Sequence, residues 1–306
     1  MALALRRLHP LFGVEILGVD TTRPLAPEAF AEIRAALDTH ALLLFRDQPH
    51  DDATQIAFSR LFGTLEPTGK ANPAVGTVFA RQSNLDIETG AVIPPEDRRM
   101  RYQKGNYLWH SDSSFKAVPS LCSLLSARIV PPEGGNTEFA DLRAAYDALP
   151  QAMKDKLAGL VAEHDLVYSR STIDPSVLTG EMQDELPAVR QAMVRVNPVT
   201  GRKSIYAGAH ASHVIGWPIA EGRAFIKELM DFATQPRFCH SHKWRVGDIV
   251  VWDNRCLVHR ATAYDTVRYQ RLMQRTTVRG EEGQTAPQGP PGQREWRKLP
   301  PVPAAL

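Results

Sequence analysis

Residues 247–280 of the chain read GDIVVWDNRCLVHRATAYDTVRYQRLMQRTTVRG, which holds two runs rich in hydrophobic and β-branched residues on either side of a polar stretch. We expect residues 247–261 and 269–280 to form strands near the end of the fold. Upstream, residues 194–210 predict two shorter strands joined by a turn that contains proline and glycine. The later part of the chain is therefore expected to supply much of the β-structure.

Apolar residues recur at helical spacing in three other segments, namely residues 27–41, 141–149 and 218–235. Asp141 is a candidate N-cap for the second of these helices, and Pro150 marks its end. A short buried strand is expected at residues 41–48, directly after the first helix. The mixture of helices and late strands predicts an α+β fold.

The composition is that of a globular protein without a strong charge bias. Of 306 residues, 43% are hydrophobic, and 36 Lys and Arg against 34 Asp and Glu leave a net charge of +2. That balance excludes the broad positive surface of a nucleic-acid-binding protein. No run of about 18 apolar residues is present, and the N-terminus lacks the order of a signal peptide. Three cysteines without a CxxC pair do not predict a disulfide scaffold, so we expect a cytoplasmic protein.

Two segments depart from the pattern of a compact domain. Residues 68–104 are polar and rich in glycine, proline and mixed charge, which is typical of a functional loop or lid. Residues 281–306 are rich in proline and predict an extended tail. We therefore expect a single domain over residues 1–280, with a lid-like loop inside it and the tail outside it.

A candidate metal site begins in residues 106–115, NYLWHSDSSF, where His110 and Asp112 are two positions apart. On a strand this spacing would place both side chains on one face. His259, on a predicted strand far along the chain, could add a second imidazole, and two histidines with one carboxylate form the ligand set of non-haem Fe(II) oxygenases. The pair alone is a common coincidence, because an isolated His110 is more often a hydrogen-bonded loop histidine.

Several longer motifs favour a metal site over an isolated loop histidine: WHSDSSF, VPPEGGNTEFADLRAAYDALP, GAHASHV, GDIVVWDNRCLVHR and QRLMQRTT. In these motifs the sequence resembles the Fe(II)/2-oxoglutarate-dependent dioxygenases of the taurine dioxygenase and 2,4-dichlorophenoxyacetate dioxygenase family, and most of all the herbicide-degrading branch. The resemblance extends from HPLFGVEILGVD near the start to RTTVRG near residue 280. It implies a double-stranded β-helix, or jelly roll, with helices packed outside.

The resemblance assigns the iron to His110, Asp112 and His259. It also implies that Thr137 and Arg271 bind the distal carboxylate of 2-oxoglutarate. Arginine suits that position, since its planar fork can bind a carboxylate with two hydrogen bonds and does not lose its charge.

Arg275 is four residues after Arg271, so on one strand both side chains would face the same side. Two inward cations imply two anions, and the resemblance gives the second anion to the substrate. It further implies substrate-binding or pocket-lining positions at Lys70, Ser114 and His213. We interpret His210 as a packing or hydrogen-bonding histidine.

The sequence therefore predicts an Fe(II)-, 2-oxoglutarate- and O₂-dependent dioxygenase. Acting on an aryloxyacetate, it would hydroxylate the carbon next to the ether oxygen and give a phenol, glyoxylate, succinate and CO₂. Two alternatives stay open at this point: a relative that acts on an alkylsulfonate or a sulfate ester, and a jelly-roll binding module without turnover. We expect a homo-oligomer that acts on a small carboxylate, with neither nucleic acid nor membrane as a partner.

Overall fold

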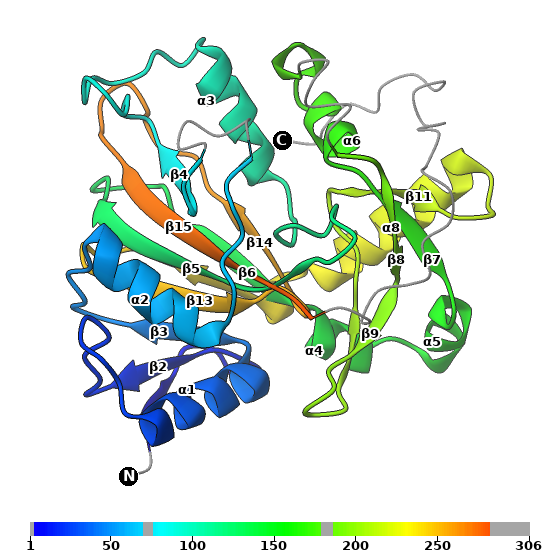
Figure 1. Cartoon of the computed structure of the whole chain (residues 1–306). Helices are drawn as coiled ribbons and strands as arrows, with labels where there is room; N and C mark the ends of the chain where they lie inside the picture. Colours follow the sequence, from blue (N-terminus) through cyan, green and yellow to red (C-terminus); the bar gives the residue numbers. More distant parts are fainter. Residues whose placement is uncertain (1–2, 70–75, 179–185, 282–306) are drawn as a thin grey trace.

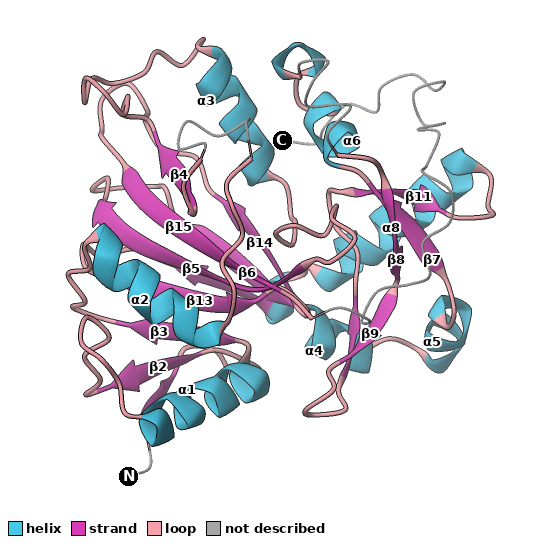
Figure 2. Cartoon of the chain, viewed as in Figure 1, coloured by secondary structure: helices cyan, strands magenta, loops and turns pink. Residues whose placement is uncertain are grey.

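The computed structural model describes residues 3–69, 76–178 and 186–281, and Figure 2 shows how helices and strands alternate along them. The helices in these ranges are α1 (Pro27–His40), α2 (Asp52–Phe62), α3 (Arg98–Gln103), α4 (Leu142–Asp147), α5 (Gln151–Leu157), α6 (Leu166–Ser171) and α8 (Ile219–Ala233), with short 3₁₀ helices η1 (Lys104–Tyr107), η2 (Pro175–Val177) and η3 (Pro236–Phe238). None of them combines the length and the apolar composition needed to cross a lipid bilayer.

The large sheet in the described part of the chain has seven strands in the order β1-β2-β3-β13-β5-β15-β4. Its strands are β1 (Ala4–Arg7), β2 (Val14–Leu17), β3 (Leu42–Phe45), β4 (Phe79–Ser83), β5 (Ser120–Ile129), β13 (Ile249–Asp253) and β15 (Leu272–Arg279). The pairing is antiparallel except between β2 and β3. Strands from both ends of the sequence therefore meet at its centre (Figure 1).

Smaller sheets accompany it, in the orders β12-β6-β14, β11-β7-β8 and β10-β9. Their strands are β6 (Thr137–Asp141), β7 (Val161–His164), β8 (Val189–Ala192), β9 (Val194–Val196), β10 (Lys203–Ile205), β11 (Ala211–Val214), β12 (Cys239–His242) and β14 (Leu257–Ala261).

The sheet β12-β6-β14 packs one face against the large sheet. Phe139 of β6 and Leu257 of β14 share a buried cluster with Trp252 and Met273 of the large sheet. Val258, the neighbour of Leu257, belongs instead to a cluster with α4 and α8 on the opposite face. This alternation is the two-residue period of a strand, and it makes the space between the two sheets the place where inward side chains of β14 and β15 converge.

Helices α1 and α2 cover the other face of the large sheet (Figure 1). Pro27 starts α1, where its missing N–H costs nothing, and Ala41 ends it in a left-handed conformation with φ 62°. Ile33 and Leu37, four residues apart on one face, are fully buried against the sheet. Local propensity and apolar spacing therefore agree on this helix.

Most predicted elements are confirmed. Strands form within residues 247–261 and 269–280, a strand pair within 194–210, and helices within 27–41 and 218–235. Asp141 caps α4, and its carboxylate accepts hydrogen bonds from two backbone N–H groups at the start of that helix.

Two expectations are wrong. Residues 106–115 do not form a strand, because the chain turns directly after an isolated bridge at His110. Residues 68–104 are not a continuous loop, since their described part contains β4 and α3. β4 completes one edge of the large sheet through its pairing with β15, so tertiary context gives structure to a segment of weak periodicity. The tail beyond residue 281 lies outside the described residues.

Candidate metal centre

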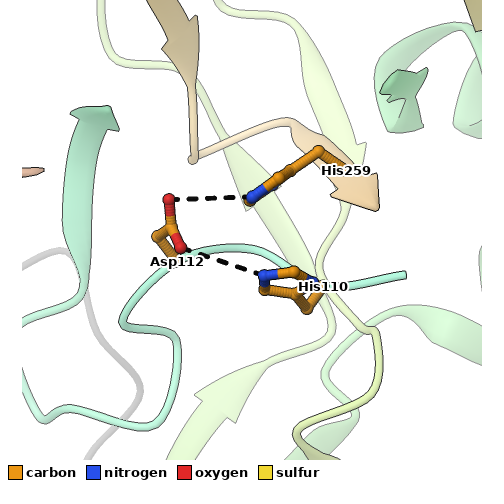
Figure 3. A group of neighbouring side chains, drawn as sticks. All are labelled: His110, Asp112 and His259. Carbon is orange, nitrogen blue, oxygen red and sulfur yellow. Dashed lines mark ion pairs between the residues drawn. The ribbon is translucent and has the colours of Figure 1, made fainter. Parts of the chain in front are cut away.

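His110, Asp112 and His259 lie together at the edge of the space between the sheets. The backbone of His110 forms an isolated antiparallel bridge with His259 of β14, in which each N–H donates to the other carbonyl at 3.0 and 2.8 Å. One potential ligand atom from each of the three side chains lies within 4.8 Å of the other two. Figure 3 shows the carboxylate of Asp112 facing both imidazole rings.

A turn, rather than a strand, orients the carboxylate of Asp112 towards the two histidines. Ser113 has a φ of 54°, an uncommon value for a residue other than glycine, and it bends the chain directly after Asp112. Asn254 accepts a hydrogen bond from the Asp112 backbone N–H, and the Ser123 hydroxyl donates to Oδ2 of Asp112 at 2.6 Å. The orientation of the carboxylate is thus fixed from two neighbouring segments.

The three groups are in the protonation states that bind metal. Nδ1 of His110 lies 2.7 Å from the Leu108 carbonyl, so it carries the proton and leaves Nε2 with a free lone pair towards Asp112. Burial lowers the pKa of His110 to about 4 and that of His259 well below its ordinary value. Burial alone would raise the pKa of Asp112, but Arg275 and the two imidazoles outweigh it and hold the pKa at about 2. At neutral pH the site offers two neutral imidazoles and a carboxylate.

This donor set fits Fe(II). Two imidazole nitrogens and one carboxylate on one side of an ion leave its other positions open, as non-haem Fe(II) oxygenases require. The ring of His259 packs against Trp252 and Phe139, at centroid distances of 4.7 and 6.1 Å, which limits its movement. His110, Asp112 and His259 are therefore suitable iron ligands.

Arg271 is a buried cation for which the described residues show no carboxylate partner. The residue is 7% exposed, and the only hydrogen bonds of its guanidinium within the described ranges are long ones, at 3.4 Å, to the carbonyls of Gln82 and Gly135. Burial lowers its pKa, the usual effect of taking a cation out of water. Gly135 lies directly beside this side chain, since a Cβ built there would be 3.4 Å from the Arg271 Nε. Such a group is suited to bind an incoming carboxylate.

Thr137 begins β6 and is buried. Its Oγ1 accepts a hydrogen bond from the indole N–H of Trp244 at 3.0 Å, which leaves the hydroxyl proton available to donate. A donor hydroxyl and a guanidinium fork are both complementary to a carboxylate.

Arg275 comes from β15, two residues beyond the inward-facing Met273. Its Nη1 donates to Oδ1 of Asp112, so the anion that it contacts in this structure is the carboxylate of the metal site. The guanidinium therefore lies where it can also reach a ligand bound beside the metal.

A cavity of about 330 Å³ opens beside the metal site, and His110, Asp112 and Arg275 form part of its wall. Other parts of the wall come from Glu66–Lys116, an ion pair of 2.6 Å, and from α3, η1 and α6. The segment predicted as a lid, residues 68–104, thus contributes Arg99 and Tyr102 to the wall. Lys70 lies outside the described residues.

Neither Ser114 nor His213 is among the described residues that line this cavity. The Ser114 hydroxyl points to His164, at 3.1 Å, and His213 lies against Ser212, at 2.9 Å. A register shift in β11 between Ala211 and His213 breaks the alternation along this segment.

His210, which we interpreted as a packing or hydrogen-bonding histidine, forms a hydrogen bond and is also part of the wall. Its ring centroid lies 5.7 Å from that of His110, and its Nδ1 lies 2.8 Å from the Ser169 hydroxyl. Arg170 also lines the cavity, and no sequence motif marks it.

Comparisons with known proteins agree with this geometry. Residues 4–277 match the family described as taurine catabolism dioxygenase TauD, TfdA family. A 2,4-dichlorophenoxyacetate dioxygenase of Burkholderia sp. (strain RASC), described as α-ketoglutarate-dependent, is 40% identical over 92% of this chain and 96% of its own. An (S)-phenoxypropionate/α-ketoglutarate dioxygenase of Sphingobium herbicidovorans is 36% identical over 90% and 94% of the two chains. The crystal structure of AAD-2 with Mn(II) and N-oxalylglycine superposes with a TM-score of 0.86, at 40% identity over 94% of this chain and all of that chain.

Proposed function

The chain belongs to the taurine catabolism dioxygenase TauD, TfdA family, and we propose that it oxidises an aryloxyacetate such as 2,4-dichlorophenoxyacetate. It is a 2-oxoglutarate-dependent dioxygenase, which uses Fe(II) and O₂. The observation that carries the substrate proposal is a cavity that joins a His/Asp/His site to the guanidinium of Arg275. A small acid can enter such a cavity with its carboxylate paired and its ring against the apolar wall.

The proposed reaction inserts one oxygen atom of O₂ into a C–H bond of the carbon between the ether oxygen and the carboxylate. The other oxygen atom enters 2-oxoglutarate, which leaves as succinate and CO₂. The hydroxylated product is a hemiacetal, which breaks its bond to the aryl oxygen and gives a phenol and glyoxylate. Fe(II), held by His110, Asp112 and His259, would supply the activation of O₂.

The protein groups bind and orient the two acids. Arg271 and Thr137 are the proposed partners of the distal 2-oxoglutarate carboxylate, and Arg275 is the proposed partner of the substrate carboxylate. Lys70 is a further proposed contact on the substrate side. Together they would hold the reacting carbon beside the metal, which raises the rate by positioning without a protein acid or base.

We also propose that the two facing sheets form the double-stranded β-helix, or jelly roll, of one domain over residues 1–280. Residues 281–306 would follow it as a proline-rich tail. A cytoplasmic location and a homo-oligomeric state complete the proposal. Size-exclusion chromatography with light scattering tests the oligomeric state.

The substrate proposal predicts phenol and succinate in equal amounts from 2,4-dichlorophenoxyacetate, with Fe(II), 2-oxoglutarate and O₂ all required. The measurement is product formation by the purified protein across a panel of aryloxyacetates, an alkylsulfonate and a sulfate ester. Sulfite or sulfate release without phenol would identify the alternative substrate class. Tight binding of the acids without any succinate would identify a binding module.

Arg275→Ala is expected to raise the KM for the aryloxyacetate roughly tenfold or more, since truncating one partner of a buried charge pair costs on the order of 2 kcal/mol or more. The KM for 2-oxoglutarate should change much less, and the ratio of phenol to succinate should fall, because a loosely held substrate is oxidised less often. Metal content is measured in parallel, since Arg275 also contacts Asp112. Equal rises in both KM values would show that Arg275 does not bind the substrate.

A further inference from the structure

Arg170 enters the cavity from α6, far along the chain from the other arginines of the site. In Figure 1, α6 lies in the right-hand half of the molecule and β15, which carries Arg275, in the left-hand half. Both side chains nevertheless line the same cavity.

Within the described ranges, Arg170 forms no ion pair, although its side chain is 92% buried. Its relative exposure is 8%, its Nε has no hydrogen-bond partner there, and its one side-chain bond is a long one of 3.3 Å to Asn106. Its guanidinium carbon lies 4.6 Å from the centroid of the Tyr102 ring, which holds the plane of the fork. A buried cation without an anion costs free energy that a bound anion would recover.

Three other cations of the cavity wall, Lys116, Arg99 and Arg275, already have anions. Lys116 pairs with Glu66, Arg99 pairs with Asp86 and Asp97, and Arg275 pairs with Asp112. An incoming carboxylate must compete with a protein carboxylate for each of these groups. At Arg170 the described residues provide no such competitor.

Gly105, in η1, explains how the side chain reaches the cavity. A Cβ at this position would overlap Nη1 and Cζ of Arg170. Gly105 does not have a left-handed backbone conformation, so its backbone would accept any residue. The overlap with Arg170 is therefore what a larger residue would meet at this position. The absence of a side chain there gives the guanidinium its path.

We propose that Arg170 is a second guanidinium for the carboxylate of the substrate, acting from the α6 wall together with Arg275 from the β15 wall. The inference rests on the proposed function and deepens it. Two cations on two walls fix the direction of the carboxylate more narrowly than one, so Arg170 selects acids over neutral molecules of the same shape. It is a binding and specificity residue, with no part in the chemical step.

The test is calorimetric titration of 2,4-dichlorophenoxyacetate into protein loaded with Zn(II) and 2-oxoglutarate, which does not turn over. Arg170→Met is expected to raise the Kd for the acid about tenfold or more. The Kd for 2-(2,4-dichlorophenoxy)ethanol, a neutral molecule of similar shape, should change less than about twofold. Unchanged loading with 2-oxoglutarate shows that the variant is folded.

Two further variants separate the guanidinium from general packing. Gly105→Ala keeps every charge and displaces Arg170, so it should reproduce the selective loss of acid binding. Arg202→Met removes an arginine that pairs with Asp147 outside the cavity wall, and it should leave the Kd for the acid nearly unchanged.

Equal Kd values for the acid in wild type and Arg170→Met would overturn the inference and leave the proposed function intact. Equal losses for the acid and the alcohol would also overturn it, since they would indicate a packing role. If the wild type binds 2-oxoglutarate but not the acid, the proposed substrate class is wrong, and the inference falls with it.

Discussion

Asp112→Ala is expected to abolish turnover and stoichiometric Fe(II) binding while the fold survives. The site has three ligands from the chain, and the described residues offer no fourth group that could replace a lost one. Removing Asp112, the only carboxylate ligand, also leaves Arg275 without its ion-pair partner. We expect residual activity below about 1% of wild type, because changes outside the ligand set already cost 10- to 100-fold. His110→Ala and His259→Ala should behave alike. Mass spectrometry measures the metal content of each variant, and circular dichroism checks that it is folded.

Ser123→Ala is the graded control for this prediction. It removes the hydrogen bond to Oδ2 of Asp112, together with the one that Ser123 accepts from the Asn254 amide, and it keeps all three ligands. Metal affinity should fall roughly 10-fold, within the range for groups that orient a ligand. Substantial turnover by metal-saturated Asp112→Ala would refute the assignment of the site.

Arg271→Met is expected to raise the KM for 2-oxoglutarate roughly 30-fold or more, since losing one partner of a buried charge pair costs on the order of 2 to 5 kcal/mol. Arg271 is buried and has no carboxylate partner in the described ranges, so no other group there replaces it. The KM for the second acid should change little at saturating 2-oxoglutarate. Steady-state kinetics with each acid varied in turn make the comparison.

Arg268→Met is the matched control, because Arg268 is an exposed arginine of the same segment. It should leave both KM values unchanged. A cosubstrate KM of wild-type size in Arg271→Met would remove Arg271 from the cosubstrate site.

The sequence predicts best where local pattern and tertiary packing agree. Helix α1 has apolar residues at helical spacing and a proline at its start, and β13 and β15 are rich in residues that favour strands. The strand expected through His110 fails because only the backbone bridge to His259 is formed before Ser113 turns the chain. β4 and α3 were missed because their order depends on neighbours distant in sequence, such as β15.

The residues of the candidate site also differ in how well the sequence predicts them. Sequence motifs predict His110, Asp112 and His259 as ligands, and the structure places these three side chains together. The sequence does not predict Arg170 as a residue of the cavity. Its position depends on how α6 packs and on the absence of a side chain at Gly105, and neither feature appears as a spacing in the sequence.

The bridge between His110 and His259 also has a consequence for the order of events during synthesis. Ser111, beside His110, bonds the carbonyl of Leu257, 146 residues away in sequence. Contacts of such high contact order form late, after much loop-closure entropy has been lost. A nascent chain therefore cannot bring His110, Asp112 and His259 together until β14 has left the ribosome and paired with the segment at His110.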